Sequence, residues 1–225
     1  MAKKTDIDLD KLLQAGAHFG HHAKRWNPRM GEYIYGLKDG VHVFDLIKTK
    51  EKLEEAINAL KDAKAKGKVI LFLGTKKQVK DKIKEVAIEV GSPYIDDRFL
   101  GGTFTNFEQI LKSVRKLIEM QTKLANGEYG AYTKKEKLLI AREIEKKEKI
   151  FGGIKNLTKR PDVIFVVDTH REKGAVKEAM TMGITTVGIV DTNADPNLVN
   201  YPIPMNDDAS NALSYVLDLI KDALK

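Results

Sequence analysis

The chain has 225 residues, of which 42% are hydrophobic, enough to bury an ample core as one domain or as a domain with an insertion. Lys and Arg number 39 against 32 Asp and Glu, a formal net charge of +7, which favours an anionic partner such as nucleic acid, an acidic protein or a membrane surface. Cysteine is absent, which excludes disulfides and thiolate metal sites, and no apolar run approaches the roughly 20 residues that a membrane span needs.

The first third of the chain predicts a short helix, a loop, two strands and a longer helix. The opening MAKKTDIDLD has no apolar stretch of a secretory signal, which predicts a cytoplasmic location. A helix is expected over 9–15, and a loop over 19–30. Residues 33–36 and 41–46 alternate like two strands around an LKDG turn. Residues 48–66 have the periodicity of an amphipathic helix.

The rest of the chain outside 105–151 alternates buried strands with helices. Strands are expected at 68–74, 93–97, 162–168 and 185–191, and helices around Val79 to Val90, at 172–182 and at 208–224. Strand, helix, strand in this order implies right-handed crossovers between parallel strands. The fold class predicted is α/β, a doubly wound parallel sheet with helices on both faces.

Residues 105–151 predict an antiparallel coiled-coil hairpin, inserted into an α/β domain made of 1–104 and 152–225. Capping boxes start its two helices, Thr105 with Glu108 and Thr133 with Glu136. Apolar residues at three and four spacing form the expected seam. They are Phe107, Ile110, Val114, Leu117 and Leu124 on the first helix and Leu139, Ile140, Ile144 and Phe151 on the second.

Some features would suit a nucleotide- or metal-dependent enzyme. Gly74 follows a strand, where the amino end of a helix could receive phosphate, but GTKKQ has neither the dinucleotide nor the P-loop pattern, and a tight turn is favoured. His170 and Arg171 have no nucleophile elbow or cysteine to activate. Acids follow predicted strand ends, where turn and cap roles are favoured over a metal site. They are Asp168, Asp191, Asp195, Asp207 and Asp208.

The stretch FGHHAKRWNPRM, residues 19–30, concentrates histidines, basic residues and the single tryptophan. His18 and His22 would share a face of a helix, as two zinc ligands do, but Gly20 interrupts that helix and a third ligand is not evident. Phosphate contacts and an aromatic that stacks or anchors the loop fit the stretch better. The residues concerned are Lys24, Arg25, Trp26 and Arg29.

The order of several blocks resembles the bacterial small-subunit ribosomal protein S2 family. The blocks are LLQAGAHFGHHAKRWNPRM, YIYGLKDGVHVFDL, VILFLGTKKQ, RFLGGTFTNF, FGGIKNLTKRPDVIFVVDTHREKGAVKEA and GITTVGIVDTNADPNLVNYPIPMNDDA, and the match runs from about residue 7 to residue 222. The resemblance implies a flavodoxin-like domain with an inserted hairpin, no enzymatic activity and binding to small-subunit rRNA between head and body. It also implies neighbouring ribosomal proteins, including S1, as partners, with a role in mRNA recruitment.

From residue type and position we expect spread RNA contacts rather than one groove. The expected contacts are Lys24, Arg25, Trp26 and Arg29, Lys76 and Lys77 at the start of a helix, Arg98, and Lys155, Lys159 and Arg160 beside the hairpin base. No cofactor, metal, membrane or small-molecule substrate is expected, and the location is the small ribosomal subunit in the cytoplasm. The alternative is the nucleotide- or metal-dependent α/β enzyme.

Overall fold

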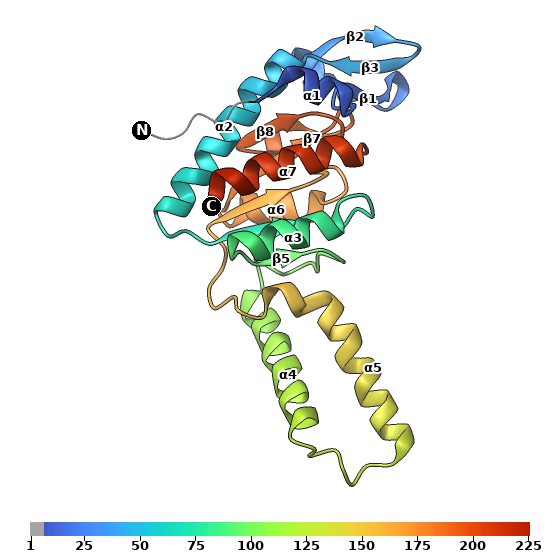
Figure 1. Ribbon diagram of the computed structural model, residues 1–225, viewed down its shortest axis with the longest axis vertical. Coiled ribbons are helices and arrows are strands. Elements are labelled where there is room, and N and C mark those ends of the chain that lie inside the picture. Colours follow the sequence, from blue (N-terminus) through green and yellow to red (C-terminus); the bar gives the residue numbers. More distant parts are fainter. Residues whose placement is uncertain (1–6) are drawn as a thin grey trace.

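A five-stranded sheet forms the centre of the computed structural model, which describes residues 7–225 (Figure 1). The strand order is β5-β4-β6-β7-β8, and every neighbouring pair is parallel. The strands are β4 (Ile70–Leu73), β5 (Tyr94–Ile95), β6 (Val163–Val166), β7 (Thr185–Val190) and β8 (Tyr201–Pro204). In chain order this is second, first, third, fourth, fifth, the flavodoxin-like arrangement. The predicted doubly wound sheet is confirmed.

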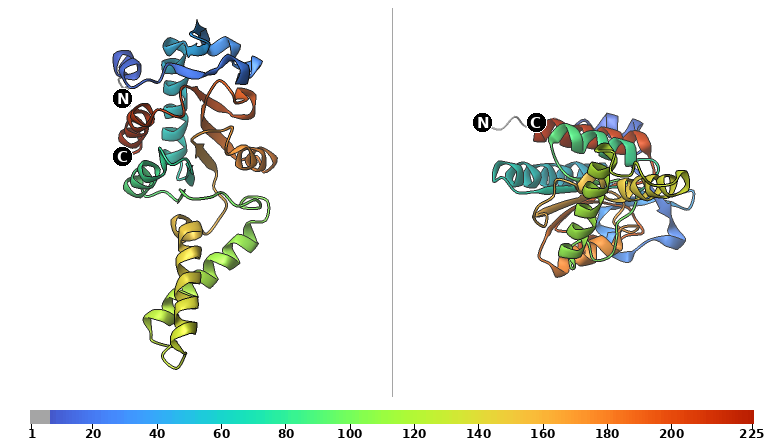
Figure 2. Two further views of the ribbon diagram at one scale, coloured as in Figure 1. Left: turned by 90° about the vertical axis from the view of Figure 1, so that its right-hand side faces the viewer. Right: turned by 90° about the horizontal axis from the view of Figure 1, so that it is seen from below.

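Each face of the sheet is covered by its own helices (Figure 2). Ile70 and Phe72 of β4 enter a core with α1, α2, α3 and α7, whereas Leu71 and Leu73 enter a core with α6 and parts of α4 and α5. Successive side chains of β4 thus point to opposite faces of the sheet, and both faces are buried. The helices are α1 (Leu9–Gln14), α2 (Leu46–Ala65), α3 (Lys80–Val90), α4 (Phe107–Ala125), α5 (Lys134–Phe151), α6 (Lys173–Thr181) and α7 (Ser210–Leu224).

Strand β8 is absent from the sequence prediction because it contains Pro202 and Pro204. Proline has no N–H to donate to a ladder, so it argues against a central strand. In the structure β8 lies at the edge and pairs with β7 alone, where a missing donor on one side is tolerated. The chain that leaves β8 therefore reaches Asp207 beside the end of β7.

A second, antiparallel sheet lies at one end of the molecule, in the order β1-β3-β2. Its strands are β1 (Phe19–His22), β2 (Ile34–Lys38) and β3 (Val41–Phe44). The two predicted strands are confirmed, and Asp39 and Gly40 between them both have positive φ, 51° and 78°, as tight hairpin turns require. The predicted loop over 19–30 is wrong at its start, because residues 19–22 form β1 and pair with β3. The sequence FGHH does not alternate between apolar and polar residues, so it gave no sign of a strand.

Helices α4 and α5 run in opposite directions and project from the sheet (Figure 1). The seam prediction is confirmed near the base, where Val114 and Leu117 of α4 and Ile144 of α5 are buried. It is wrong toward the tip, because Leu124 and Leu139 are 49% and 55% exposed. The tip is therefore held together by fewer apolar contacts than the sequence pattern suggests.

The two capping boxes have different outcomes. Thr133 and Glu136 form the predicted box at the start of α5. At the start of α4 the prediction is wrong, because the helix begins at Phe107 and Thr105 donates instead to the carboxylate of Glu178 on α6. This carboxylate also accepts the backbone N–H groups of Gly102 and Phe104, so a tertiary acceptor replaces the local cap.

The division into a 1–104 plus 152–225 domain and a 105–151 hairpin stays a prediction, and its first six residues lie outside the described residues. Between residues 7 and 225, no helix combines the length and apolar character that crossing a membrane demands.

Candidate nucleic-acid interface

The segment after β1 presents basic side chains to solvent. It contains the 3-10 helices η1 (Ala23–Arg25) and η2 (Pro28–Tyr33). Lys24, Arg25 and Arg29 are exposed. The side chain of His22 accepts the backbone N–H of Lys24, and that of Asn27 accepts the N–H of Arg29. These caps order the basic loop, a name that we use for residues 24–29.

Trp26 anchors the basic loop and remains 38% exposed. Its ring lies 4.8 Å from the ring of His42 on β3, measured between centroids. The backbone N–H of Asn27 donates to the carbonyl of Thr192 at 2.7 Å, which ties the loop to the end of β7. An indole that is partly exposed beside cations suits stacking with an unpaired base.

The cations of the basic loop differ in their partners. Arg29 forms an ion pair with Asp195, with 2.5 Å between Nη1 and Oδ2. Within residues 7–225, neither Lys24 nor Arg25 forms an ion pair with a carboxylate. These two side chains are therefore the least neutralised cations of the loop.

Lys76 is placed differently from the sequence expectation. Its side chain is 12% exposed, and its ammonium lies 3.2 Å from Asp168, 2.6 Å from Asp207 and 2.7 Å from Asp208. It lies in a turn, since α3 begins only at Lys80. The expected position at the start of a helix is wrong, and a cation already bound by three carboxylates is a poor phosphate ligand.

Burial and ion pairing act against each other in this cluster. Burial alone would lower the pKa of Lys76, but hydrogen bonds to Asp207 and Asp208 outweigh it, so the pKa is raised. Burial raises the pKa of Asp207, and repulsion from Asp191 and Asp168 raises it further. We call the carboxylates at the carboxyl ends of the strands the acidic cluster, and the ammonium of Lys76 is their shared ion-pair partner. The cluster consists of Asp168, Asp191, Asp207 and Asp208.

His21 joins the acidic cluster from β1. Its Nδ1 lies 3.1 Å from Asp191, whose hydrogen bond raises the pKa of the imidazole. His21, Asp191 and Asp207 each bring one ligand atom within 4.8 Å of the others, a donor set that suits a divalent cation. The sequence hypothesis selected His18 and His22, not His21. Because His21 and His22 are successive residues of β1, their side chains face opposite sides, and only His21 reaches the acidic residues. The expected absence of a metal stays a prediction.

A second basic group lies at the hairpin base, between α5 and β6. Lys159 and Arg160 are exposed. Lys155 is half-buried and lies 2.5 Å from Glu148, which also accepts a hydrogen bond from Gln121 of α4. Lys155 is therefore partly neutralised by the same carboxylate that joins α5 to α4. The structure adds Lys64 and Lys68, which line a pocket with Lys155 and Lys159 and which sequence spacing gave no reason to select.

The remaining expected residues are not brought together. Lys77 is exposed in the turn before α3, and Arg98 is exposed between β5 and α4. The basic loop lies near the end of β7, whereas the second basic group precedes β6. The cations therefore lie at both ends of the central strands and not in one cluster, and their contact with RNA stays a prediction.

The geometry of the carboxyl edge does not suit a nucleotide. In doubly wound folds this edge is the usual ligand site, and here carboxylates that would repel phosphate occupy it. Gly74 serves packing, because a Cβ atom there would lie 2.8 Å from the side chain of Ile83. The feature that suggested a phosphate site is therefore a close strand-to-helix contact.

Comparisons with known proteins agree on one family. The model of the family described as Ribosomal protein S2 matches residues 12–225. Proteins named Small ribosomal subunit protein uS2 are similar over most of the chain. That of Wolinella succinogenes is 43% identical over 97% of this chain and 81% of its own length, and that of Coprothermobacter proteolyticus has the same three values. That of Sulfurimonas denitrificans is 45% identical over 92% and 80%. The chain belongs to the ribosomal protein S2 family, whose members are structural proteins and not enzymes.

Proposed function

We propose that this protein is a structural constituent of the small ribosomal subunit. It binds small-subunit rRNA between head and body, and it supports the docking of protein S1 and the recruitment of mRNA. The names of its relatives support the place in the small subunit. The basic loop carries the proposal for RNA, because Lys24 and Arg25 are ordered, exposed and free of ion pairs within residues 7–225.

Phosphate neutralisation is the physical basis of the proposed attachment. Each cation that contacts a phosphate releases condensed counterions, so binding weakens as salt rises. The proposed contacts are Lys24, Arg25, Trp26, Arg29, Lys77, Arg98, Lys155, Lys159 and Arg160, without Lys76. Because they lie on several faces of the molecule, we propose that the protein contacts more than one rRNA segment.

The double variant Lys24→Glu with Arg25→Glu tests the basic loop. We expect it to remain folded, because both side chains are exposed. Its affinity for subunits that lack this protein falls, and the slope of log affinity against log salt decreases by roughly 2, since two phosphate contacts are lost. Filter binding at several salt concentrations measures both quantities.

The matched control is Lys84→Glu with Lys177→Glu, which changes the net charge equally at exposed positions of α3 and α6. Equal losses in both double variants would mean that only net charge matters, and they would remove the basic loop from the proposal.

An exposed apolar strand supports the proposed protein contact. Tyr35 and Leu37 are 82% and 58% exposed on the solvent-facing side of β2, an edge strand whose ladder with β3 is irregular between Ile34 and Gly36. Exposed apolar groups at a sheet edge are typical of protein-binding surfaces. We assign this side to a neighbouring ribosomal protein, with S1 as the partner to test.

Replacing Tyr35 and Leu37 with serine tests this assignment. We expect S1 to be retained less on the small subunit, while attachment of the variant to rRNA is unchanged. Quantitative blotting of purified subunits measures both, and Met180→Ser, at a 60% exposed position on α6, is the control. Full retention of S1 would exclude this side as its docking surface.

A further inference from the structure

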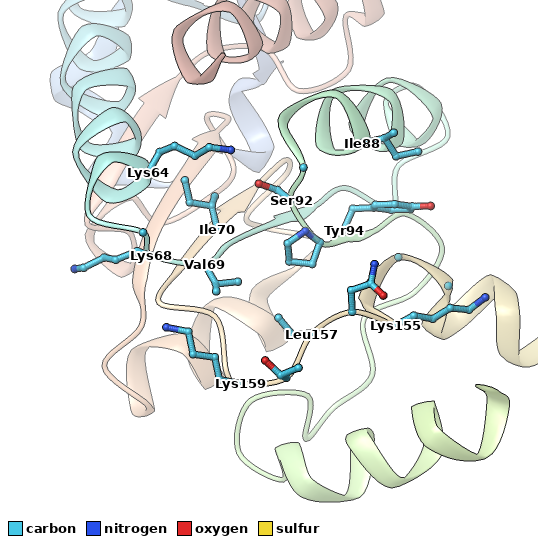
Figure 3. A pocket seen from close by; sticks show the side chains of 17 residues that line it. Lys64, Lys68, Val69, Ile70, Ile88, Ser92, Tyr94, Lys155, Leu157 and Lys159 are labelled. Atoms are coloured by element: carbon cyan, nitrogen blue, oxygen red, sulfur yellow. The ribbon is translucent and has the colours of Figure 1, made fainter. Parts of the chain in front are cut away.

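A pocket shown in Figure 3 lies where the parallel strands β4 and β5 begin, at the end of the sheet opposite the acidic cluster. It encloses about 600 Å³. Its walls come from the start of β4, the start of β5 and the segment 152–159 that leads from the hairpin toward β6. We call it the amino-edge pocket. The side chains that line this pocket indicate which class of ligand it suits.

The charge of the amino-edge pocket is one-sided. In the part of the chain that the structure describes, four of the 17 lining residues are lysines and none is acidic. Figure 3 shows Lys68 and Lys159 on one side of the pocket and Lys155 on the other. This arrangement favours an anion at the mouth.

The four ammonium groups are not equally available. Lys64 donates to the carbonyl of Val90 at 2.5 Å, and Lys155 pairs with Glu148. Lys159 lies 3.1 Å from Asp162, an exposed pair of a kind that contributes little stability and is readily exchanged for another anion. Lys68 is exposed and forms no ion pair with a described carboxylate. Lys68 and Lys159 are therefore the pair that would contact a phosphate.

Part of the interior wall is apolar. Val69, Pro93, Tyr94 and Leu157 line the pocket, and Figure 3 shows the ring of Tyr94 along one wall. Ile88 lies at the rim and is 59% exposed, a large apolar side chain left open to solvent. An apolar slot with an aromatic wall and cations at its mouth suits a base whose phosphate remains outside.

We infer that the amino-edge pocket receives one unpaired nucleotide of the rRNA, with its base against Tyr94 and its phosphate on Lys68 and Lys159. This inference rests on the proposed function and adds a specific contact to it. A paired base cannot enter a pocket, so the contact selects a bulged or looped nucleotide. The polar side chains of Ser92 and Thr158 also line the pocket and offer hydrogen bonds to a base edge.

Filling the pocket tests the inference. Small subunits that lack this protein are reconstituted with the wild type, with Ser92→Trp or with Ser210→Trp, and the rRNA is probed at single-nucleotide resolution with reagents for unpaired bases. Ser210 is exposed at the start of α7, outside the pocket, so its variant is the matched control. We expect one unpaired base to be protected by the wild type and the control, and to regain full reactivity with Ser92→Trp.

The outcomes separate this inference from the proposed function. If Ser92→Trp leaves every protection in place, the pocket holds no base, although the protein still binds rRNA. If the wild type does not sediment with the reconstituted subunits, the proposed function itself fails. If Ser92→Trp does not fold, Lys68→Glu with Lys159→Glu, at exposed positions, replaces it with the same expected loss of protection. A photoreactive residue at Thr158 that crosslinks to protein and not to rRNA would overturn the inference in favour of a protein ligand.

Discussion

Replacing Lys76 with methionine lowers the free energy of unfolding by about 3–5 kcal/mol, the cost of removing one partner from a buried ion pair. The ammonium lies within 3.2 Å of three carboxylates, and its removal leaves Asp168 and Asp207 buried without a cation. Methionine keeps most of the aliphatic volume, so the loss reports charge rather than packing. Denaturant unfolding followed by circular dichroism measures it.

Lys77→Met is the control for this prediction, because Lys77 is the exposed neighbour in the same turn. Its effect should stay within about 0.5 kcal/mol. Adding Asp207→Asn to Lys76→Met should restore part of the stability, because it removes one of the uncompensated charges. Equal stability of the Lys76 and Lys77 variants would contradict the role that we give to Lys76.

Replacing Leu117 with aspartate disrupts the hairpin of α4 and α5. Leu117 is fully buried, so the variant loses its apolar contacts and buries an unpaired charge, at a cost of about 3–5 kcal/mol. The two helices project from the sheet, so the loss should appear as reduced helical signal and increased proteolysis within 107–151, while the sheet stays folded.

The matched control is Leu124→Asp on the same helix, at a position that is 49% exposed. It carries the same change in side chain and charge, and we expect little effect on thermal stability. If both variants were equally destabilised, the seam would extend to the tip, as the sequence pattern predicts and the structure contradicts.

The elements that depend on local patterns are predictable from the sequence. Buried runs such as 68–74 and 162–168 identify central parallel strands, because a strand covered on both faces needs apolar residues at every position. The capping box of Thr133 and Glu136 is equally local. The edge strand β8 is not predictable in this way, because its two prolines argue against a strand. They are tolerated because β8 pairs with β7 alone, and that position is a property of the folded sheet.

The sequence identifies the residue types of the candidate site, but it does not predict which side chains contact one another there. Lys76 resembles any other lysine after a strand, and its partner Asp207 is 131 residues away in the chain. His21 meets Asp191 only because β1 lies beside the end of β7, and the sequence assigns β1 to a loop. The exposure of Lys24 and Arg25 is easier to predict, because they lie in a polar turn with no acidic residue next to them in the chain.

The two edges of the central sheet differ in charge, and this difference organises the proposed contacts. The carboxyl edge holds the acidic cluster around Lys76, whereas the amino edge holds the lysine-lined pocket beside the hairpin. We propose that rRNA contacts the amino edge and also the basic loop, which lies beside the acidic cluster at the end of β7, whereas the apolar side of β2 contacts a protein neighbour.

The central claim is that this protein joins the small ribosomal subunit through phosphate contacts. The most direct measurement is sedimentation of the tagged protein from a cell lysate through a sucrose gradient in moderate magnesium, repeated after washes of increasing salt. We predict that the protein sediments with the small subunit and is released progressively as salt rises, since counterion release drives its attachment. Sedimentation as free protein at low salt, in a lysate whose small subunits can accept it, would contradict the claim.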